Sequence, residues 1–323
     1  MPTIEGVHIA PNWTSAAGAL EGILEFLGAP LPRHAIMGLT GHAWHTCLGT
    51  REGVVALPSG PHDLDWESMT ANYARAGFTW ERFLPADEVG ASRTAAIEWA
   101  AARIDSGIPV IGFDFHLHEF SVVYGYDRPG EHFFVDNVLS EEVGPIALWR
   151  DWPSPIGKIE LFAPGAPAEI DPAQVLGDAM HTALECFAGL DGPSDGQPRG
   201  TAALDVWAEA LEGDAAVDRA GNSYTLAVLQ GARLDGADFL GDLAEAIPDL
   251  QGPLEAARRA LADETQALSQ LITLFPFPSG GHGNVANIGL RRAAAMALRR
   301  AAAHERSAVA SIGEALALFT GAG

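Results

Sequence analysis

The spacing of apolar residues changes once along the chain, and this change limits the folds that it can adopt. Up to about residue 163, helical periods alternate with short apolar runs that are rich in β-branched and aromatic residues. Helices are expected at Ser15–Gly28 and Ala95–Ile104, and strands at Pro109–Phe115, Phe120–Tyr126, His132–Val135 and Lys158–Phe162. Asp127–Gly130 predicts a tight turn, so these strands are expected to form an antiparallel β-meander.

The remainder of the chain has a helical pattern almost to its end. Helices are expected at Pro172–Leu190, Thr201–Glu212, Tyr224–Ala246, Leu254–Leu274 and Val285–Leu318. The segment Ala163–Ala168, which contains only Ala, Pro and Gly, predicts a linker. We therefore expect an α+β domain over residues 1–165 and an all-α helical bundle over residues 170–323. The boundary should fall between Phe162 and Asp171, with no strand after it.

The charge balance excludes several classes of partner. Lys and Arg number 19 and Asp and Glu number 42, which gives a formal net charge of -23 over 323 residues. Such a chain is expected to bind neither nucleic acid nor an anionic membrane, because both require a basic surface. It favours a small-molecule substrate that is cationic. A homodimer is kept as a hypothesis.

The cysteines and the apolar runs indicate the compartment. Cys47 and Cys186 are too few for a disulfide framework, and no CxxC pair predicts a zinc site. No apolar run approaches the length of a membrane helix, and residues 1–10 do not resemble a signal peptide. We therefore expect a cytoplasmic protein, and the high Ala, Gly, Leu and Arg content is typical of a GC-rich bacterial genome.

Three short segments contain candidate chemistry. In GLTGHAWHTC, His42 and His45 would share one face of a helix, with Cys47 close by, although in a loop the spacing carries little information. In DFHLHE, a strand would place Asp114, His116 and His118 on one face. Those groups, completed by His42 or His45, could bind a divalent metal, whereas an ordinary polar strand end is the simpler interpretation.

The third segment is Asp136-Asn137, which follows the apolar run HFFV. A carboxylate at a strand end can orient a histidine or a substrate amine, but Asp and Asn also commonly begin turns. Pro58–Glu67 indicates a turn followed by a capped helix. Gly280–Asn284 indicates a turn between helices and not a phosphate-binding loop.

The first half of the chain resembles a known clan in the order of its segments. These are SAAGALEGILEFLG, GLTGHAW, PSGPHDLDWE, GIPVIGFDFHLHEFSVVYGYD and FFVDN. They resemble the papain-like cysteine peptidase clan in its bacterial, C39-peptidase-like branch. More narrowly, they are similar to the family of butirosin biosynthesis protein H, an acyltransferase with a papain-like N-terminal domain. The resemblance implies a papain-like fold for residues 1–165 and an enzyme of specialised metabolism.

The family's catalytic positions carry over only in part. Its nucleophilic Cys begins the first helix, and the resemblance places Ala16 there, beside Ser15. Its base His precedes the VVYGYD-type run, where this chain has Glu119 after His118. Its Asp is retained as Asp136. Two of the three positions therefore differ, and a Ser–Glu pair is a weaker nucleophile–base pair than Cys–His.

Three interpretations follow from this departure. In the first, the fold performs acyl-transfer or amide chemistry on a small molecule without a cofactor, and Glu119 is the general base. Its catalytic residues would be Glu119, His42, His118 and Asp136, and its substrate contacts Ser15, His45, Cys47, Asp114, Tyr124 and Asn137. In the second, His42, His45, His116 and His118 form a metal centre. In the third, the chain is an inactive ligand-binding or scaffold protein. Within the first interpretation, Cys47 as a displaced nucleophile is an alternative to Glu119 as the general base.

Overall fold

The computed structural model describes residues 1–58, 64–85, 89–155, 157–193, 195–278 and 282–321. The chain divides into two compact units. The first unit contains Met1–Ile36 and Thr70–Ile170, and the second contains Met37–Met69 and Asp171–Gly323. The expected α+β class, with an antiparallel sheet and a helical C-terminal region, is confirmed. The division after Ile170 falls in the predicted boundary region, whereas the grouping of residues 37–69 with the helical unit was not predicted from the sequence.

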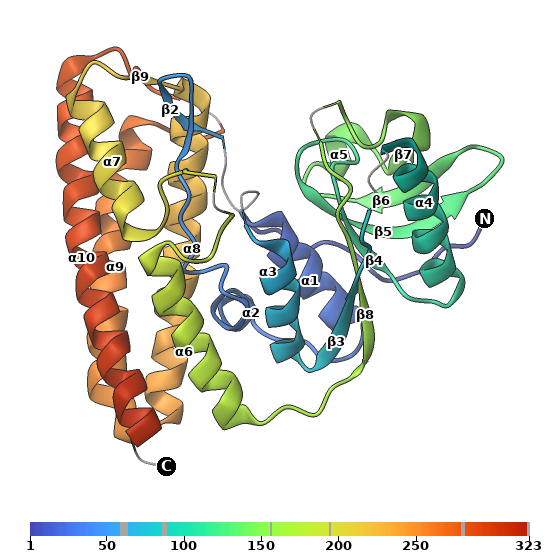
Figure 1. Ribbon diagram of the computed structural model, residues 1–323, viewed down its shortest axis with the longest axis horizontal. Helices are drawn as coiled ribbons and strands as arrows, with labels where there is room; N and C mark the ends of the chain where they lie inside the picture. Colours follow the sequence, from blue (N-terminus) through green and yellow to red (C-terminus); the bar gives the residue numbers. More distant parts are fainter. Residues whose placement is uncertain (59–63, 86–88, 156, 194, 279–281, 322–323) are drawn as a thin grey trace. The chain divides into compact units, whose positions relative to one another are not determined.

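A six-stranded sheet forms the centre of the first unit (Figure 1). Its spatial order is β3-β8-β4-β5-β6-β7, and each neighbouring pair is antiparallel. The strands are β3 (Phe78–Arg82), β4 (Val110–Phe113), β5 (Phe120–Asp127), β6 (His132–Asp136), β7 (Ile146–Leu148) and β8 (Leu161–Pro167). The meander is confirmed because β4, β5, β6 and β7 are consecutive neighbours, and the Asp127 carboxylate accepts a hydrogen bond from the Gly130 amide in the predicted turn.

Helices cover the central strands of this sheet. Helix α4 (Val89–Asp105) packs against β4, β5 and β8, and α1 (Ser15–Phe26) packs against β4 and β5. Val122 and Val123 are both fully buried although consecutive strand residues point to opposite faces. Both faces of β5 are therefore covered, which explains why its sequence is an apolar run and not an alternation.

The expected linker at Ala163–Ala168 is wrong. Most of it belongs to β8, which pairs with β4 through Leu161 and Phe162 and with β3 as far as Pro167. Proline cannot donate to a sheet, so it is tolerated only where a strand lacks a neighbour on one side. The structure meets this condition because the pairing of β8 with β4 ends before Pro164.

The N-terminal segment crosses α1 at two glycines. The Ala10 amide donates to the Gly18 carbonyl oxygen at 3.0 Å. A Cβ atom on Gly18 would lie 2.3 Å from the Ala10 carbonyl oxygen, and one on Gly22 would lie 1.7 Å from that of His8. The two glycines inside this helix therefore permit the close approach of residues 8–10.

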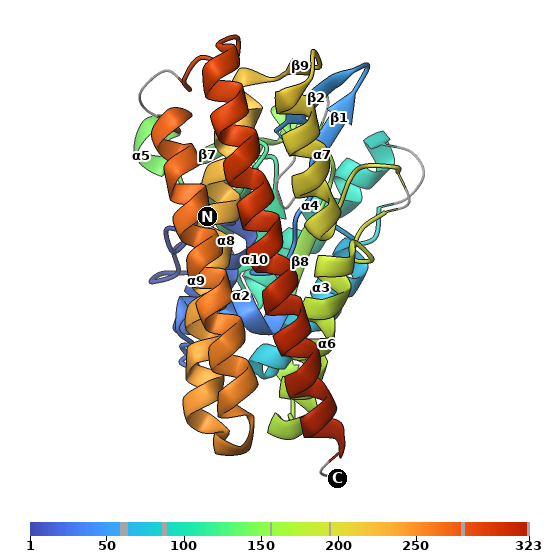
Figure 2. The ribbon, with the colours of Figure 1, turned by 90° about the vertical axis from the view of Figure 1, so that its left-hand side faces the viewer.

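Five helices make up most of the second unit. They are α6 (Pro172–Ala188), α7 (Gly200–Glu212), α8 (Arg219–Ala246), α9 (Gln251–Leu274) and α10 (Ile288–Gly321), and all five were predicted. Figure 2 shows α8, α9 and α10 running alongside one another. Their core is apolar and includes Leu204, Trp207, Leu268 and Leu298. None of the helices in the described part of the chain is both long and apolar enough to cross a membrane.

Short elements complete the chain. The remaining helices are α2 (Arg33–Thr40), α3 (Trp66–Tyr73), α5 (Ser140–Val143), and the 3-10 turns η2 (Ala74–Ala76), η3 (Trp149–Asp151) and η4 (Pro248–Leu250). The capped helix predicted after Pro58 is α3, and the Asp65 carboxylate accepts hydrogen bonds from the Glu67 amide and the Ser68 hydroxyl. Residues 59–63 of that segment and residues 280 and 281 of the predicted Gly280–Asn284 turn lie outside the described residues.

A small sheet in the second unit contradicts two expectations. Its strands are β1 (Gly49–Arg51), β2 (Val54–Leu57) and β9 (Ala216–Val217). A strand therefore does follow Asp171, and the second unit is not all-α. The physical reason is that β2 needs a partner on its second edge. The stretch between α7 and α8 supplies it through parallel pairing with Val54 and Val55, and the Asp218 amide donates to the Val55 carbonyl oxygen at 2.9 Å.

A buried ionic cluster joins three helices of the second unit. Arg233 of α8 lies 3.3 Å from Glu264 Oε1 of α9 and 2.7 Å from Glu305 Oε2 of α10. All three side chains are fully buried. Burial, followed by repulsion from Glu305, raises the pKa of Glu264 well above its usual value. One guanidinium thus serves two carboxyl groups, of which Glu264 favours its protonated form.

The raised pKa of Glu264 predicts how stability depends on pH. Above the usual pKa of 4.5, the folded protein retains a proton on Glu264 that the unfolded chain releases. The free energy of unfolding should therefore decrease as the pH rises, because the folded state binds more protons. The Gln side chain of Glu264→Gln is neutral at every pH. The free energy of unfolding of this variant, measured with urea, should therefore decrease less between about pH 5 and pH 8. Equal decreases for the two proteins would contradict this prediction.

Candidate functional site

A serine and a glutamate pair where α1 meets the start of β5. Ser15 is the first residue of α1 and is 1% exposed. Its hydroxyl donates to Glu119 Oε2 at 2.6 Å and accepts from the Phe120 amide at 3.0 Å. The neighbouring Ala16, at the family's nucleophile position, is also buried. Glu119, at the family's base position, is thus in direct contact with Ser15, the neighbour of the residue at the nucleophile position.

The loop between β4 and β5 holds Glu119 in place. This six-residue connection is DFHLHE, and its first residue, Asp114, is buried with a φ of 69°. The Asp114 amide donates to the Glu119 carbonyl oxygen at 3.1 Å, and its carboxylate accepts from the Ser154 amide at 2.6 Å. Asp114 therefore fixes both ends of the loop and the backbone of Glu119.

The expected strand face of Asp114, His116 and His118 is wrong, because these residues lie in the loop. The turn interrupts the period of two on which that expectation depended. His118 Nδ1 lies 2.7 Å from Asp114 Oδ1, with its side chain 47% exposed. Burial lowers the pKa of His116. Asp114 acts here as a partner of His118, and its predicted contact with substrate stays a prediction.

Asp136 lies at the same end of the sheet as Glu119. It is the last residue of β6 and pairs with Val122 near the start of β5, because the two strands are antiparallel. Its Oδ2 accepts a hydrogen bond from the Ile9 amide at 2.9 Å. Burial and, to a lesser extent, the charge of Asp136 raise the pKa of Tyr124. Asp136 therefore anchors the N-terminal segment and influences Tyr124 electrostatically.

Asn137 begins a turn. Its side-chain oxygen accepts from the Leu139 amide at 2.8 Å, and its own amide donates to the Ser140 hydroxyl at 2.7 Å. The turn interpretation of this residue is confirmed. Its role in substrate binding stays a prediction.

The histidines of GLTGHAWHTC lie in the second unit and not on a helix. Helix α2 ends at Thr40, so His42 and His45 occupy the turn and the loop that follow it. Burial, with a smaller contribution from His45, lowers the pKa of His42 to about 3. His42 is therefore a neutral imidazole at neutral pH, which argues against a cationic general acid at this position. His42 and Glu119 belong to different units, and the expectation that they act in one catalytic site stays a prediction.

The structure also shows where Cys47 and the four histidines of the metal interpretation lie. Cys47 is buried and forms an antiparallel bridge with Arg199. Within the described ranges, no three His, Cys, Asp or Glu side chains are arranged to hold a metal ion. The four histidines of the metal interpretation divide between the units, with His42 and His45 in the second and His116 and His118 in the first.

Sequence reasoning missed two sets of polar residues. His45 pairs with Asp191, and Arg233 pairs with Glu264 and Glu305. Asp191 begins an irregular stretch between two helices, where no spacing rule connects it with His45. The other three are charged residues in helical patterns, where an exposed position is the usual expectation.

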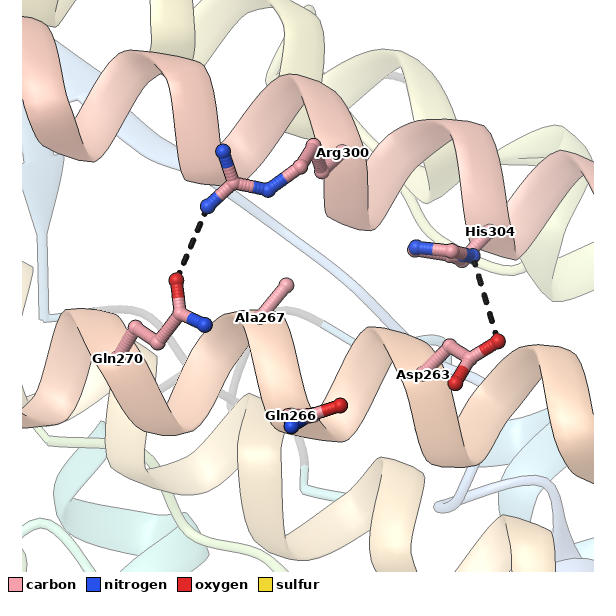
Figure 3. Close-up of a pocket in the computed structure, with 6 residues that line it drawn as sticks. All are labelled: Asp263, Gln266, Ala267, Gln270, Arg300 and His304. Atoms are coloured by element: carbon pink, nitrogen blue, oxygen red, sulfur yellow. Dashed lines mark hydrogen bonds and ion pairs between the residues drawn. The ribbon is translucent and has the colours of Figure 1, made fainter.

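A polar pocket lies between α9 and α10 (Figure 3). Arg300 donates to the Gln270 side-chain oxygen at 3.0 Å, and His304 Nδ1 lies 4.0 Å from Asp263 Oδ2. Figure 3 shows these groups reaching across from one helix to the other. Since the polar ends pair with each other and Asp263 is 61% exposed, we interpret the pocket as a surface contact between helices.

Comparison with known proteins adds no family. The sequence matches no family model, and no curated protein is significantly similar to it. The assignment of residues 1–165 to a papain-like fold therefore depends on the sequence resemblance alone and is a proposal.

Removing the Ser15 hydroxyl should destabilise the first unit. Ser15→Ala leaves the buried Phe120 amide without this acceptor and Glu119 without this donor. We expect the free energy of unfolding to fall by about 1–3 kcal/mol, measured by urea denaturation. Ser307→Ala is the control, because the Ser307 hydroxyl makes an exposed bond to the Ala303 carbonyl oxygen. Equal changes in the two variants would contradict a structural role for the Ser15 bonds.

Proposed function

We propose that this protein is a bacterial small-molecule enzyme of acyl-transfer or amide chemistry, with Glu119 as its general base. The observation that carries the proposal is the 2.6 Å hydrogen bond between Ser15 and Glu119. It joins a helix start to a strand start, and Asp136 ends the adjacent strand. The resemblance places the family's nucleophile at Ala16, next to Ser15, its base at Glu119 and its Asp at Asp136, so the resemblance and the geometry support the same site.

The reaction can proceed without a covalent enzyme intermediate, because Ala16 has no nucleophilic atom. The nitrogen of an amine attacks the carbonyl of an acyl donor, and Glu119 accepts the proton that the amine loses. A C–N bond forms and the bond to the leaving group breaks. Glu119 then transfers the proton to the leaving thiolate or alkoxide, so that the carboxylate is restored.

In this proposal Ser15 is a positioning residue. Its oxygen already accepts from the Phe120 amide while its proton points to Glu119. The bond fixes the carboxylate relative to α1, which is useful because general-base catalysis depends on the position of the base. His118 is the proposed electrophilic partner, which donates a hydrogen bond to the carbonyl oxygen of the acyl donor, since its ring is partly exposed and its Nδ1 is held 2.7 Å from Asp114 Oδ1. Asp136 is proposed to orient the substrate amine.

The substrate class and the location are part of the same proposal. A net charge of -23 favours a cationic amine as the acceptor. Both cysteines are buried thiols, which is compatible with the reducing cytoplasm.

A direct assay tests the proposal. Purified protein is incubated with the N-acetylcysteamine thioester of a short-chain acid and a panel of cationic amines, and amide products are measured by mass spectrometry. We expect wild-type protein to accelerate amide formation over buffer and Glu119→Gln to lose the acceleration. The enzymatic proposal would be contradicted if the protein accelerated neither hydrolysis of the thioester nor its aminolysis by any amine of the panel.

A second candidate function is binding without catalysis. The observation that favours it is the burial of Ser15, both of whose bonds in the structure end on protein groups. Such a pair can serve only to fasten α1 to β5. Glu119→Gln separates the two functions, because the amide oxygen can still accept the Ser15 proton but cannot act as a base. A binding protein should retain its ligand in this variant.

A further inference from the structure

A second polar pair lies in the helical unit. It does not include Glu119, and the inference drawn from it does not depend on the function proposed for Glu119. His45 Nδ1 is hydrogen-bonded to Asp191 Oδ2. The side chains are 4% and 11% exposed, respectively. Burial acts to raise the pKa of Asp191, but the hydrogen bond and charge of His45 hold it below its usual value. Asp191 is therefore an ionised carboxylate that holds the Nδ1 side of the ring.

The other ring nitrogen of His45 has no protein partner among the described residues. Nε2 is buried, and those residues offer it no hydrogen bond. A buried polar atom without a partner costs about 1–3 kcal/mol, so each such atom requires an explanation. When Nδ1 carries the proton that faces the carboxylate, Nε2 is an acceptor. Nε2 is thus a hydrogen-bond acceptor that lacks a donor in the part of the chain that the structure describes.

The two segments that carry this pair are firmly held together. The Arg233 guanidinium donates to the Ala43 carbonyl oxygen at 2.7 Å and to the Thr46 hydroxyl at 2.5 Å. The Gly200 amide donates to the Thr46 carbonyl oxygen at 3.0 Å, and the Leu48 amide donates to that of Pro198 at 2.9 Å. These bonds fix the loop that carries His45 against the stretch that begins at Asp191. The orientation of the ring is therefore set before any ligand binds.

The charged groups near His45 are already engaged. Asp191 is paired with His45 itself, and Arg233, which reaches the His45 carbonyl oxygen at 3.5 Å, is paired with Glu305. His42 is close enough for the two rings to interact electrostatically, and its lowered pKa keeps it neutral. A hydroxyl group can donate one hydrogen bond to Nε2 and carries no charge, so its burial costs much less than the burial of an ammonium ion.

We propose that His45, held by Asp191, is the acceptor of a second binding site, which takes a small molecule through one of its hydroxyl groups. The ligand is an alcohol or a polyol and not an amine. Aspartate fixes the ring and histidine receives the hydroxyl proton in the hydrogen bond. This site belongs to the second unit and differs in chemistry from the carboxylate site at Glu119.

Diethylpyrocarbonate tests the site in the full-length wild-type protein. The reagent carbethoxylates unprotonated imidazole nitrogens, and peptide mass spectrometry gives the rate at each histidine. We expect His45 to react, and propane-1,2-diol to slow its reaction by about threefold or more, a change that corresponds to one hydrogen bond. The ether 1,2-dimethoxyethane, similar in shape but without a donor, should leave the rate unchanged. His181, 64% exposed and paired with Glu185, is the internal control and should respond to neither additive.

Three results would overturn the proposal. An unreactive His45 beside a reactive His181 would show that small molecules do not reach Nε2, and equal protection by diol and ether would exclude recognition of the hydroxyl group. The third result concerns Asp191→Asn. The Asn amide can donate to Nδ1, which places the ring proton on Nε2. His45 should then react more slowly than in the wild type while His181 does not change. An unchanged His45 rate in a variant with the wild-type circular dichroism spectrum would exclude the role of Asp191.

Discussion

Glu119→Gln is expected to lower the rate of acyl transfer by about 10²-fold or more. The amide has nearly the shape of the carboxylate but cannot accept a proton from an attacking amine. Its oxygen can still accept the hydrogen bond that Ser15 donates to Glu119 in the wild type. The variant should therefore retain most of its stability, within about 1 kcal/mol, while it loses activity. Product formation from the thioester and amine panel measures the first effect, and urea unfolding measures the second.

Cys47→Ala is the matched control for this experiment. Cys47 is buried in the second unit, and the proposal based on Glu119 gives its thiol no part in proton transfer or bond formation. Activity should stay largely intact in Cys47→Ala. The opposite pattern, with turnover lost in Cys47→Ala and retained in Glu119→Gln, would assign the reaction to a displaced cysteine nucleophile.

Arg233→Met is expected to cause the largest loss of stability, about 3–5 kcal/mol in the free energy of unfolding. The change leaves the fully buried Glu305 carboxylate without this cation. It also removes the donor to the Ala43 carbonyl oxygen and to Thr46. Urea denaturation followed by circular dichroism gives the value. If the variant does not fold, the triple change Arg233→Met, Glu264→Leu and Glu305→Leu should restore folding, because no unpaired charge then remains in the cluster.

Arg258→Met provides the comparison. Arg258 lies on α9 and pairs with Glu255 three residues away, at 39% and 34% exposure. Water already solvates this pair, so its loss should cost less than about 1 kcal/mol. Similar losses in Arg233→Met and Arg258→Met would show that the buried cluster contributes no more than a surface ion pair.

Local patterns of the sequence were sufficient for much of the fold. The meander was predictable because β4, β5 and β6 are joined by short connections and each is an apolar run. The five long helices follow from their apolar periods. The position of β8 between β3 and β4 was not predictable, because it brings together distant residues and its last residues include two prolines. The sheet formed by β1, β2 and β9 was also missed, because β9 is distant in the chain from β2 and has only two residues.

The site was predictable only in part. The resemblance placed Ala16, Glu119 and Asp136 at the catalytic positions, and the structure brings Glu119 into contact with Ser15, the neighbour of Ala16. The resemblance did not indicate that Asp136 would bind the Ile9 amide, because this bond depends on how the N-terminal segment crosses α1. Asp191 was missed because its partner His45 lies 146 residues away in the chain. Pairs of this kind are formed by the folded backbone and leave no spacing in the sequence.

The composition of the second unit has a consequence for synthesis on the ribosome. Residues 37–69, which contain β1 and β2, are made early but belong with Asp171–Gly323. β2 pairs with β9, and the Ala43 carbonyl oxygen and the Thr46 hydroxyl accept hydrogen bonds from Arg233. Both β9 and Arg233 are made much later. β1 and β2 can pair with each other early, but the second edge of β2 gains its partner only when β9 has been made. Until then, the open edge of the apolar β2 is a place where the nascent chain needs protection from aggregation.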